Sequence, residues 1–171
     1  MTMSLATTLA KTLISKKESE MINDKLKMMG ELKIVLSSPD QEDRIVEVNN
    51  LVVSSGLAYI ASRMKDTAAD VMSHMAIGSG TVDALAADVS VGSQLARVDL
   101  TSTTLVTTNV DFDAVQYVAT FLPGTGTGAV TEAGIFNDAT AGTMLCRTVY
   151  PVINKGEADT LTITWKVTIE A

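Results

Sequence analysis

The stretch DTLTITWKVTIE, residues 159–170, decides the fold class because its side chains alternate almost perfectly. Threonine or lysine separates apolar residues that occupy every second position, namely Leu161, Ile163, Trp165, Val167 and Ile169. Successive side chains of a β-strand point to opposite faces, so this period of two predicts a strand with one buried and one exposed face. We therefore expect a mainly β chain.

Further segments on the N-terminal side of this strand repeat the pattern, with turn residues between them. The predicted strands cover 30–36, 44–50, 74–81, 96–108, 109–121, 130–138 and 142–150, and PGTGTGA (123–129) is a glycine-rich turn. The spacing of Leu57, Ile60, Ala61 and Met64 predicts a short helix within 51–66, with Ser54 or Ser55 as its cap. Short strands separated by glycine and proline turns predict an antiparallel β-sandwich, jelly-roll-like, over residues 30–171.

The first 29 residues differ from the rest and predict an N-terminal amphipathic helical arm. Leucines recur every four residues in 4–16, and a second helix is expected over 18–28, ended by Gly30. Residues 1–29 hold five lysines and three acidic residues, whereas residues 30–171 hold eight basic and 17 acidic residues. A basic arm on an acidic body suggests docking, although a solvated helix and a membrane-surface helix are alternatives. The candidate docking residues are Leu5, Leu9, Leu13, Lys16, Lys17, Met21 and Leu26.

Composition excludes several classes of function. The chain has 171 residues, one cysteine, one histidine and a net charge of −7. The cysteine and histidine counts rule out a disulfide framework and multi-histidine or cysteine metal sites. The negative charge argues against a nucleic-acid partner, because phosphate contacts need clustered lysine and arginine. No apolar stretch is long enough to span a membrane, and we expect no membrane partner, metal or cofactor.

Candidate catalytic residues are few. Asp111 and Asp113 are expected on one strand face, where a carboxylate pair could do acid–base work or form a polar surface. Glu132 could be a general base, or it could pair with Arg97 or Arg147. We expect His74 and Cys146 to be structural. Ser54, Ser55 and Ser79 lack a nucleophile-elbow motif, and the GxG at Gly78 and Gly80 is expected to form a tight turn with positive φ.

The order of four segments resembles a recurring β-rich module of tailed-bacteriophage virion proteins, found in tail, baseplate and collar fibres and in small head-attached proteins. The segments are HMAIGSGT (74–81), SQLARVDLTS (93–102), VQYVATFLPGTGTGAVTEAGIFND (115–138) and TMLCRTVYPVINKGEADTLTITWKVTI (143–169). The matching positions, which the resemblance implies serve the fold or an interface, are Gly78, Gly80, Leu95, Arg97, Glu132, Ala133, Gly134, Phe136, Lys155 and Trp165.

The resemblance implies a virion structural protein without enzymatic activity, made in the host cytoplasm and assembled into the particle. Its expected partners are copies of itself, with a trimer favoured, and other tail, collar or capsid proteins. The expected role is a short fibre or adaptor at the tail, collar or baseplate, anchored through the arm. The alternatives are a capsid decoration protein on the head and a module that binds host glycans. A hydrolase that uses acidic residues is the third class.

Overall fold

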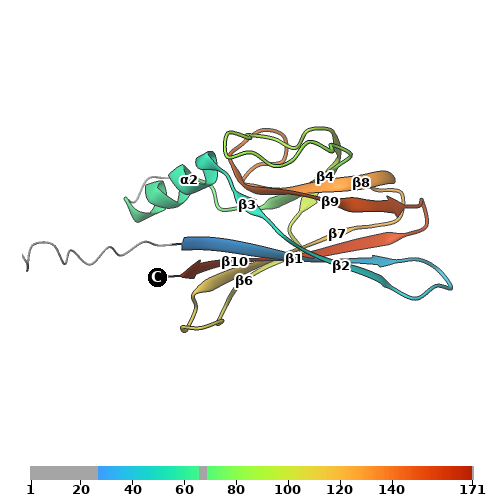
Figure 1. Ribbon diagram of the computed structural model, residues 1–171, viewed down its shortest axis with the longest axis horizontal. Coiled ribbons are helices and arrows are strands. Elements are labelled where there is room, and N and C mark those ends of the chain that lie inside the picture. Colours follow the sequence, from blue (N-terminus) through green and yellow to red (C-terminus); the bar gives the residue numbers. More distant parts are fainter. Residues whose placement is uncertain (1–26, 66–68, 171) are drawn as a thin grey trace, which may run out of the picture.

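The computed structural model describes residues 27–65 and 69–170, which form two five-stranded antiparallel sheets and one short helix (Figure 1). Sheet A has the order β2 (Arg44–Asn49), β1 (Lys27–Ser37), β10 (Thr160–Glu170), β7 (Ala114–Phe121) and β6 (Ser102–Val106). Sheet B has the order β3 (Leu51–Val52), β9 (Met144–Lys155), β8 (Gly128–Phe136), β4 (His74–Gly78) and β5 (Gln94–Asp99). The helix α2 spans Ser54–Met64, and the mainly β expectation is confirmed.

The core lies between the two sheets and is organised around β10, the central strand of sheet A. The alternating apolar residues of β10 from Leu161 to Val167 are buried, as the period of two predicts, and Ile163 and Trp165 are completely inaccessible. Side chains of sheet B, including Ile77, Ile135 and Ile153, belong to the same core cluster. Burying a side chain of this size contributes about 1.5–3 kcal/mol, so this shared core is what holds the layers together.

The structure differs from the sequence-based expectation at the start of β1. This strand begins at Lys27, where the second predicted helix was expected to continue to residue 28, and Lys27–Gly30 pair with Val167–Glu170 of β10. Gly30 does not end a helix, because it lies inside the strand with the Asn50 side chain directly over its Cα, where a Cβ would collide. The body therefore begins at least three residues earlier than the predicted boundary at residue 30.

Another predicted element also differs from the structure. The expected strand over 96–108 is two strands, β5 and β6, because the chain crosses between the sheets at Leu100 and Thr101. There the Leu100 N–H donates to the Ser73 carbonyl and the Thr101 N–H donates to the Val118 carbonyl, at 2.8 and 2.7 Å. Residues 79–93 form a loop without regular structure over the outer face of sheet B (Figure 1).

The predicted helix within 51–66 is confirmed as α2, but its predicted serine cap is wrong. Val53 occupies the cap position and no side chain caps the helix. Ser55 instead donates its hydroxyl to the Met144 carbonyl at 2.9 Å, and Gly56 lies against the Leu145 carbonyl, so the helix is fastened to β9. Within the described residues, no helix has the length and apolar composition needed to cross a bilayer.

Candidate functional site

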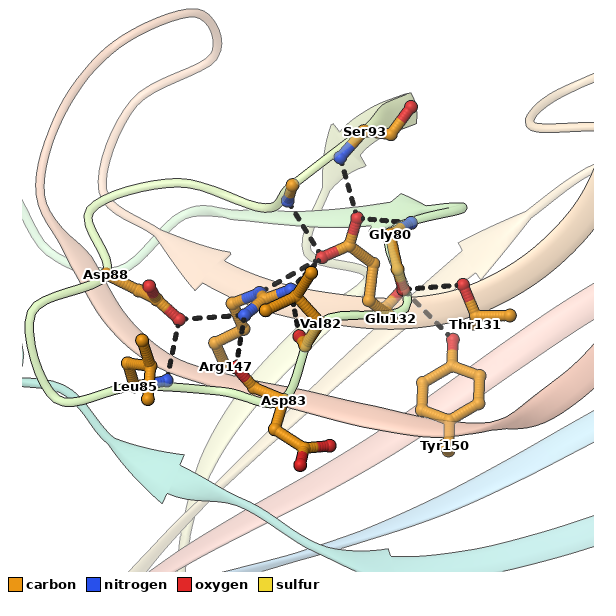
Figure 2. Close-up of polar contacts among 11 residues, drawn as sticks. Gly80, Val82, Asp83, Leu85, Asp88, Ser93, Thr131, Glu132, Arg147 and Tyr150 are labelled. Carbon is orange, nitrogen blue, oxygen red and sulfur yellow. Dashed lines mark hydrogen bonds and ion pairs between the residues drawn. The ribbon is translucent and has the colours of Figure 1, made fainter.

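A buried ion-pair network connects β8 and β9 to the loop of residues 79–93 (Figure 2). Its centre is Glu132, whose side chain is completely buried. Oε1 accepts hydrogen bonds from the backbone N–H groups of Gly80 and Ser93, each at 2.8 Å. Oε2 accepts one from the Gly92 N–H at 2.8 Å and two from the guanidinium of Arg147.

Arg147 extends this network to the far side of the loop. Its Nη2 donates to Glu132 Oε2 at 2.7 Å, and its Nη1 donates to Asp88 Oδ2 at 2.7 Å. The guanidinium also donates to the carbonyl oxygens of Val82 and Asp83, at 3.0 and 3.5 Å. We call Glu132, Arg147 and Asp88 the hub, and residues 79–93 the hub loop. The sequence analysis left Arg97 and Arg147 open as partners of Glu132, and in the structure Arg147 is the one that pairs with it.

The electrostatics of the hub favour the charged form of each member. Burial raises the pKa of the Glu132 carboxyl, but the hydrogen bonds from Gly92, Ser93, Arg147 and Gly80 outweigh burial, and the pKa lies below its ordinary value. The Leu85 N–H, which donates to Asp88 at 2.8 Å, and the Arg147 guanidinium hold the pKa of Asp88 low. The charges therefore remain paired near neutral pH.

The glycines of the predicted turn are needed for space rather than for positive φ. A Cβ at Gly78 or at Gly80 would collide with Glu132 Oε1. A Cβ at Gly92 would instead meet its nearest atom, also Glu132 Oε1, at an ordinary contact distance of 3.5 Å. Neither Gly78 nor Gly80 has a positive φ, so that expectation is wrong. The GxG allows the loop backbone to approach the buried carboxylate closely enough to donate to it.

The hub is built to hold a loop rather than to transfer protons. All five hydrogen bonds to the Glu132 carboxylate come from groups of this chain, so its lone pairs are occupied within the fold. A general base needs a lone pair directed at the group that it deprotonates. The backbone of Glu132 is fixed as well, because the Tyr150 hydroxyl donates to its carbonyl at 3.2 Å. Val91 of the loop packs in a small apolar cluster with Phe136 and Met144 beneath it.

Two further motif positions, Arg97 and Leu95, lie on β5 and contact opposite ends of β8. The guanidinium of Arg97 lies over the Phe136 ring, 3.7 Å from its centroid, which is a cation–π geometry. Its Nη1 donates to the carbonyl oxygens of Asp138 and Ala141, at 3.1 and 3.0 Å. Arg97 thereby holds the turn between β8 and β9. Leu95 is partly exposed next to Gly128, at the start of β8.

The remaining motif positions lie at the far end of β9 and in the interior. Lys155 is buried and donates its Nζ to the carbonyl oxygens of Leu122 and Asp159, at 3.1 and 2.7 Å. Burial lowers the pKa of Lys155, and Asp159 offsets part of that effect. Gly134 lies in close contact with the Phe136 ring, while Ala133 and Trp165 are completely buried. These positions all contact other parts of the same fold.

The carboxylate pair predicted on one strand face is not on a strand. Asp111 and Asp113 lie in the turn before β7. Asp113 accepts a hydrogen bond from the Thr108 hydroxyl at 2.7 Å and others from the N–H groups of Thr108, Asn109 and Val110, at 2.8 to 3.0 Å. The Thr108 hydroxyl and these N–H groups hold the pKa of its carboxyl low. Its oxygens are used to shape the loop, while Asp111 is exposed. The alternation that suggested a strand here belongs to a turn.

A short Ser–His–Asp relay was not anticipated from the sequence. Ser73 Oγ lies 2.8 Å from His74 Nδ1, and His74 Nε2 lies 2.8 Å from Asp99 Oδ1. In the sequence only Ser73 and His74 are neighbours. Asp99 comes next to His74 only because β4 pairs with β5. Asp99 is almost fully exposed, and the relay joins a sheet edge to its neighbour. We interpret it as a structural contact.

Cys146 and the predicted docking arm complete the set of candidate residues. Cys146 is buried, as expected, and burial raises the pKa of its thiol. The docking-arm residues Leu5, Leu9, Leu13, Lys16, Lys17, Met21 and Leu26 lie outside the described residues. Over 27–65 and 69–170, no three His, Cys, Asp or Glu side chains gather closely enough to hold a metal ion. No protein-family model, no curated protein and no solved structure matches this chain.

Proposed function

We propose that the chain is a non-enzymatic structural protein of a tailed-phage virion, a short fibre or adaptor at the tail, collar or baseplate that assembles as a homotrimer. Its N-terminal segment would anchor it to another virion protein. The observation that carries the proposal is the hub. The motif that resembles virion modules supplies Gly78, Gly80 and Glu132, and these residues fasten a 15-residue loop to the sheet instead of leaving a reactive group free.

We further propose that the two sheets form a β-sandwich. Support comes from the core cluster that both sheets share, and from the four connections that pass from one sheet to the other, namely β2 to β3, β5 to β6, β7 to β8 and β9 to β10. The hairpins β1–β2, β4–β5, β6–β7 and β8–β9 each stay within one sheet. A jelly roll is built from eight strands in two Greek keys. The support for a jelly-roll-like sandwich in this chain is the two-layer arrangement of its strands alone.

A rigid display module suits a particle surface. Loops longer than about 12–15 residues without secondary structure are uncommon in compact domains and are usually functional or disordered. Here the loop is instead held by buried charges and by Val91. Symmetric self-association is the usual state of such parts. The edge strands β2 and β5 carry charged residues, which discourage indiscriminate pairing at those edges.

The distribution of aromatic side chains favours this role over the glycan-binding alternative. Of the chain's seven aromatic residues, five are buried, Tyr59 is half-buried and Phe112 is 67% exposed. Amphipathic Tyr and Trp rings on a surface suit recognition, and here Trp165, Tyr117 and Tyr150 are inside. A capsid decoration protein uses the same physical features, so the test below separates it by location.

The test is whether the protein is part of a particle. Phage particles are purified by density gradient from the host that carries the gene, then analysed by quantitative mass spectrometry and by immunogold electron microscopy with antibody against the chain. We expect stoichiometric copies and label at the tail, collar or baseplate, with a trimer by light scattering of the free protein. Label over the head would favour the decoration alternative, and absence from the particle would overturn the proposal.

A further inference from the structure

An apolar groove opens at the end of the sheets where β1 begins. It encloses about 170 Å³, slightly more than the dry apolar cavity of about 150 Å³ that accepts a benzene-sized group. Its walls come from strands of both sheets and from α2, and they include Met28, Tyr59, Ile60, Leu105, Phe112 and Ile169. The groove therefore has room for an aliphatic side chain and offers it apolar contacts on several sides.

The rim of this groove is exposed and partly pre-shaped. Leu105 and Phe112 are 62% and 67% exposed, and Ile169 is 44% exposed. Phe112 has a φ of 61°, a left-handed conformation that a bulky side chain rarely adopts. Its N–H donates to Thr107 Oγ1 at 3.2 Å, and the neighbouring Asp113 fixes the preceding turn. Strained residues persist where the surroundings determine them, and they cluster at binding surfaces.

The position of the groove points to the chain's own N-terminal segment as its occupant. The chain enters the described structure at Lys27, and the next residue, Met28, lines the groove. Residues 1–26 precede this point, with leucines at every fourth position from 5 to 13. The 12 residues between 14 and 27 can span up to about 40 Å, enough to fold back on the groove.

Charge complementarity supports the same occupant. Lys11, Lys16 and Lys17 accompany the apolar stripe in the sequence. Asp113 lines the groove, with Asp111 on the same turn, and Glu170 follows the groove residue Ile169. The acidic residues at the rim would attract the lysines of the segment. This attraction would orient the segment so that its apolar side chains enter the groove, as at other interfaces.

We propose that residues 4–14 of the same chain fill this groove, with one of Leu5, Leu9 and Leu13 inserted beside Leu105 and Phe112. The same chain is the occupant because a short tether holds the segment at an effective concentration in the millimolar range. The inference rests on the proposed function: the segment that would anchor the protein in the particle is held against the body of the free protein.

Disulfide trapping in the full-length chain tests this directly. Leu105→Cys is combined in turn with Leu5→Cys, Leu9→Cys and Leu13→Cys, and native Cys146 stays silent because it is buried. The matched control combines the same three substitutions with Leu122→Cys, which is similarly exposed, at 60%, but follows the opposite end of β7. Mild oxidation is followed by non-reducing gel and mass spectrometry.

The fastest Leu105 pair should form an internal disulfide at least about tenfold faster than any Leu122 pair, at a rate independent of protein concentration. Equal rates for both positions would overturn the proposal. Covalent dimers as the main product would also overturn it, because the segment would then lie on a second copy. Particle incorporation and oligomeric state are measured on the unmodified chain, so failure here is distinguishable from failure of the proposed function.

A second measurement avoids the geometric demands of a disulfide. Leu9→Glu places a charge on the apolar stripe, and Thr8→Glu places the same charge on a neighbouring position outside the stripe. Exposure of the groove should raise the fluorescence of an apolar dye by about threefold in Leu9→Glu and leave it unchanged in Thr8→Glu. Equal fluorescence in the two variants would count against a docked segment.

Discussion

At the scale of single residues, Gly80 and Gly92 give a matched pair, because both donate their N–H to Glu132 yet differ in the space around their Cα atoms. An added methyl at position 80 meets the Glu132 carboxylate, whereas at position 92 its nearest contact is 3.5 Å away. We expect Gly80→Ala to lower the free energy of unfolding by about 1–3 kcal/mol, as overpacking does. Gly92→Ala should change it by no more than about 0.5 kcal/mol. Urea unfolding measures both, and equal losses would show that close approach is not what position 80 requires.

The charge of Glu132 makes a separate residue-scale prediction. Glu132→Gln leaves Arg147 buried without its main counter-charge, and breaking a buried pair in this way costs about 3–5 kcal/mol, measured by urea unfolding. The control is Glu31→Gln, which removes an exposed partner of Lys166 and should cost about 0–1 kcal/mol. Adding Arg147→Met to Glu132→Gln should recover part of the loss, since an apolar side chain needs no counter-charge. If the double variant is less stable than Glu132→Gln alone, the unpaired charge is not the main cause of the loss.

At the scale of elements, the turn before β7 depends on one carboxylate. Asp113 accepts the N–H groups of three successive residues, Thr108 to Val110, whereas Asp111 on the same turn is exposed. We expect Asp113→Ala to speed amide hydrogen exchange at Asn109 and Val110 by about tenfold or more, since local opening requires only these bonds to break. Asp111→Ala is the control and should leave both rates unchanged. Similar rates in the two variants would mean that backbone geometry alone holds the turn.

The elements also show why some features were predictable from the sequence and others were not. The alternation of β10 is a local pattern, and it identifies the strand because one face is buried along most of its length. The start of β1 was missed because residues 27–30 become a strand only by pairing with the far end of the chain, at Val167–Glu170. The hub was half predictable: Glu132 and Arg147 lie 15 residues apart on adjacent strands, but Asp88 joins them from a loop with no local signal. The prediction that Gly80 serves a turn with positive φ was wrong. The carboxylate that leaves no room for a Cβ at this position belongs to Glu132, which lies 52 residues away in the sequence.

At the scale of the whole molecule, two electrostatic effects oppose each other as the pH falls. The net charge is −7 and the isoelectric point is near 4.6, so acidification toward that value reduces self-repulsion and by itself would stabilise the fold. The specific carboxylates act in the other direction, because the pKa values of Glu132, Asp88 and Asp113 are lower in the folded protein than their ordinary values. The sign of the change in the free energy of unfolding with pH shows which effect dominates.

We expect these carboxylates to dominate. A carboxylate with a depressed folded pKa binds fewer protons than in the unfolded chain, so stability rises with pH across that interval. The unfolded values are about 4.3 for Glu and 3.9 for Asp, so the contribution is complete above about pH 5 and is lost as the pH falls below about 4. The free energy of unfolding from urea titrations should therefore be flat from about pH 5.5 to 7 and decline below about pH 4.5. Asp88→Asn, whose partly accessible site makes it the milder variant, should decline less steeply than the wild type, because one titrating group is gone. Parallel curves for the two proteins would mean that Asp88 contributes little to the decline. A wild type that gains stability on acidification would mean that the loss of general charge repulsion outweighs these carboxylates.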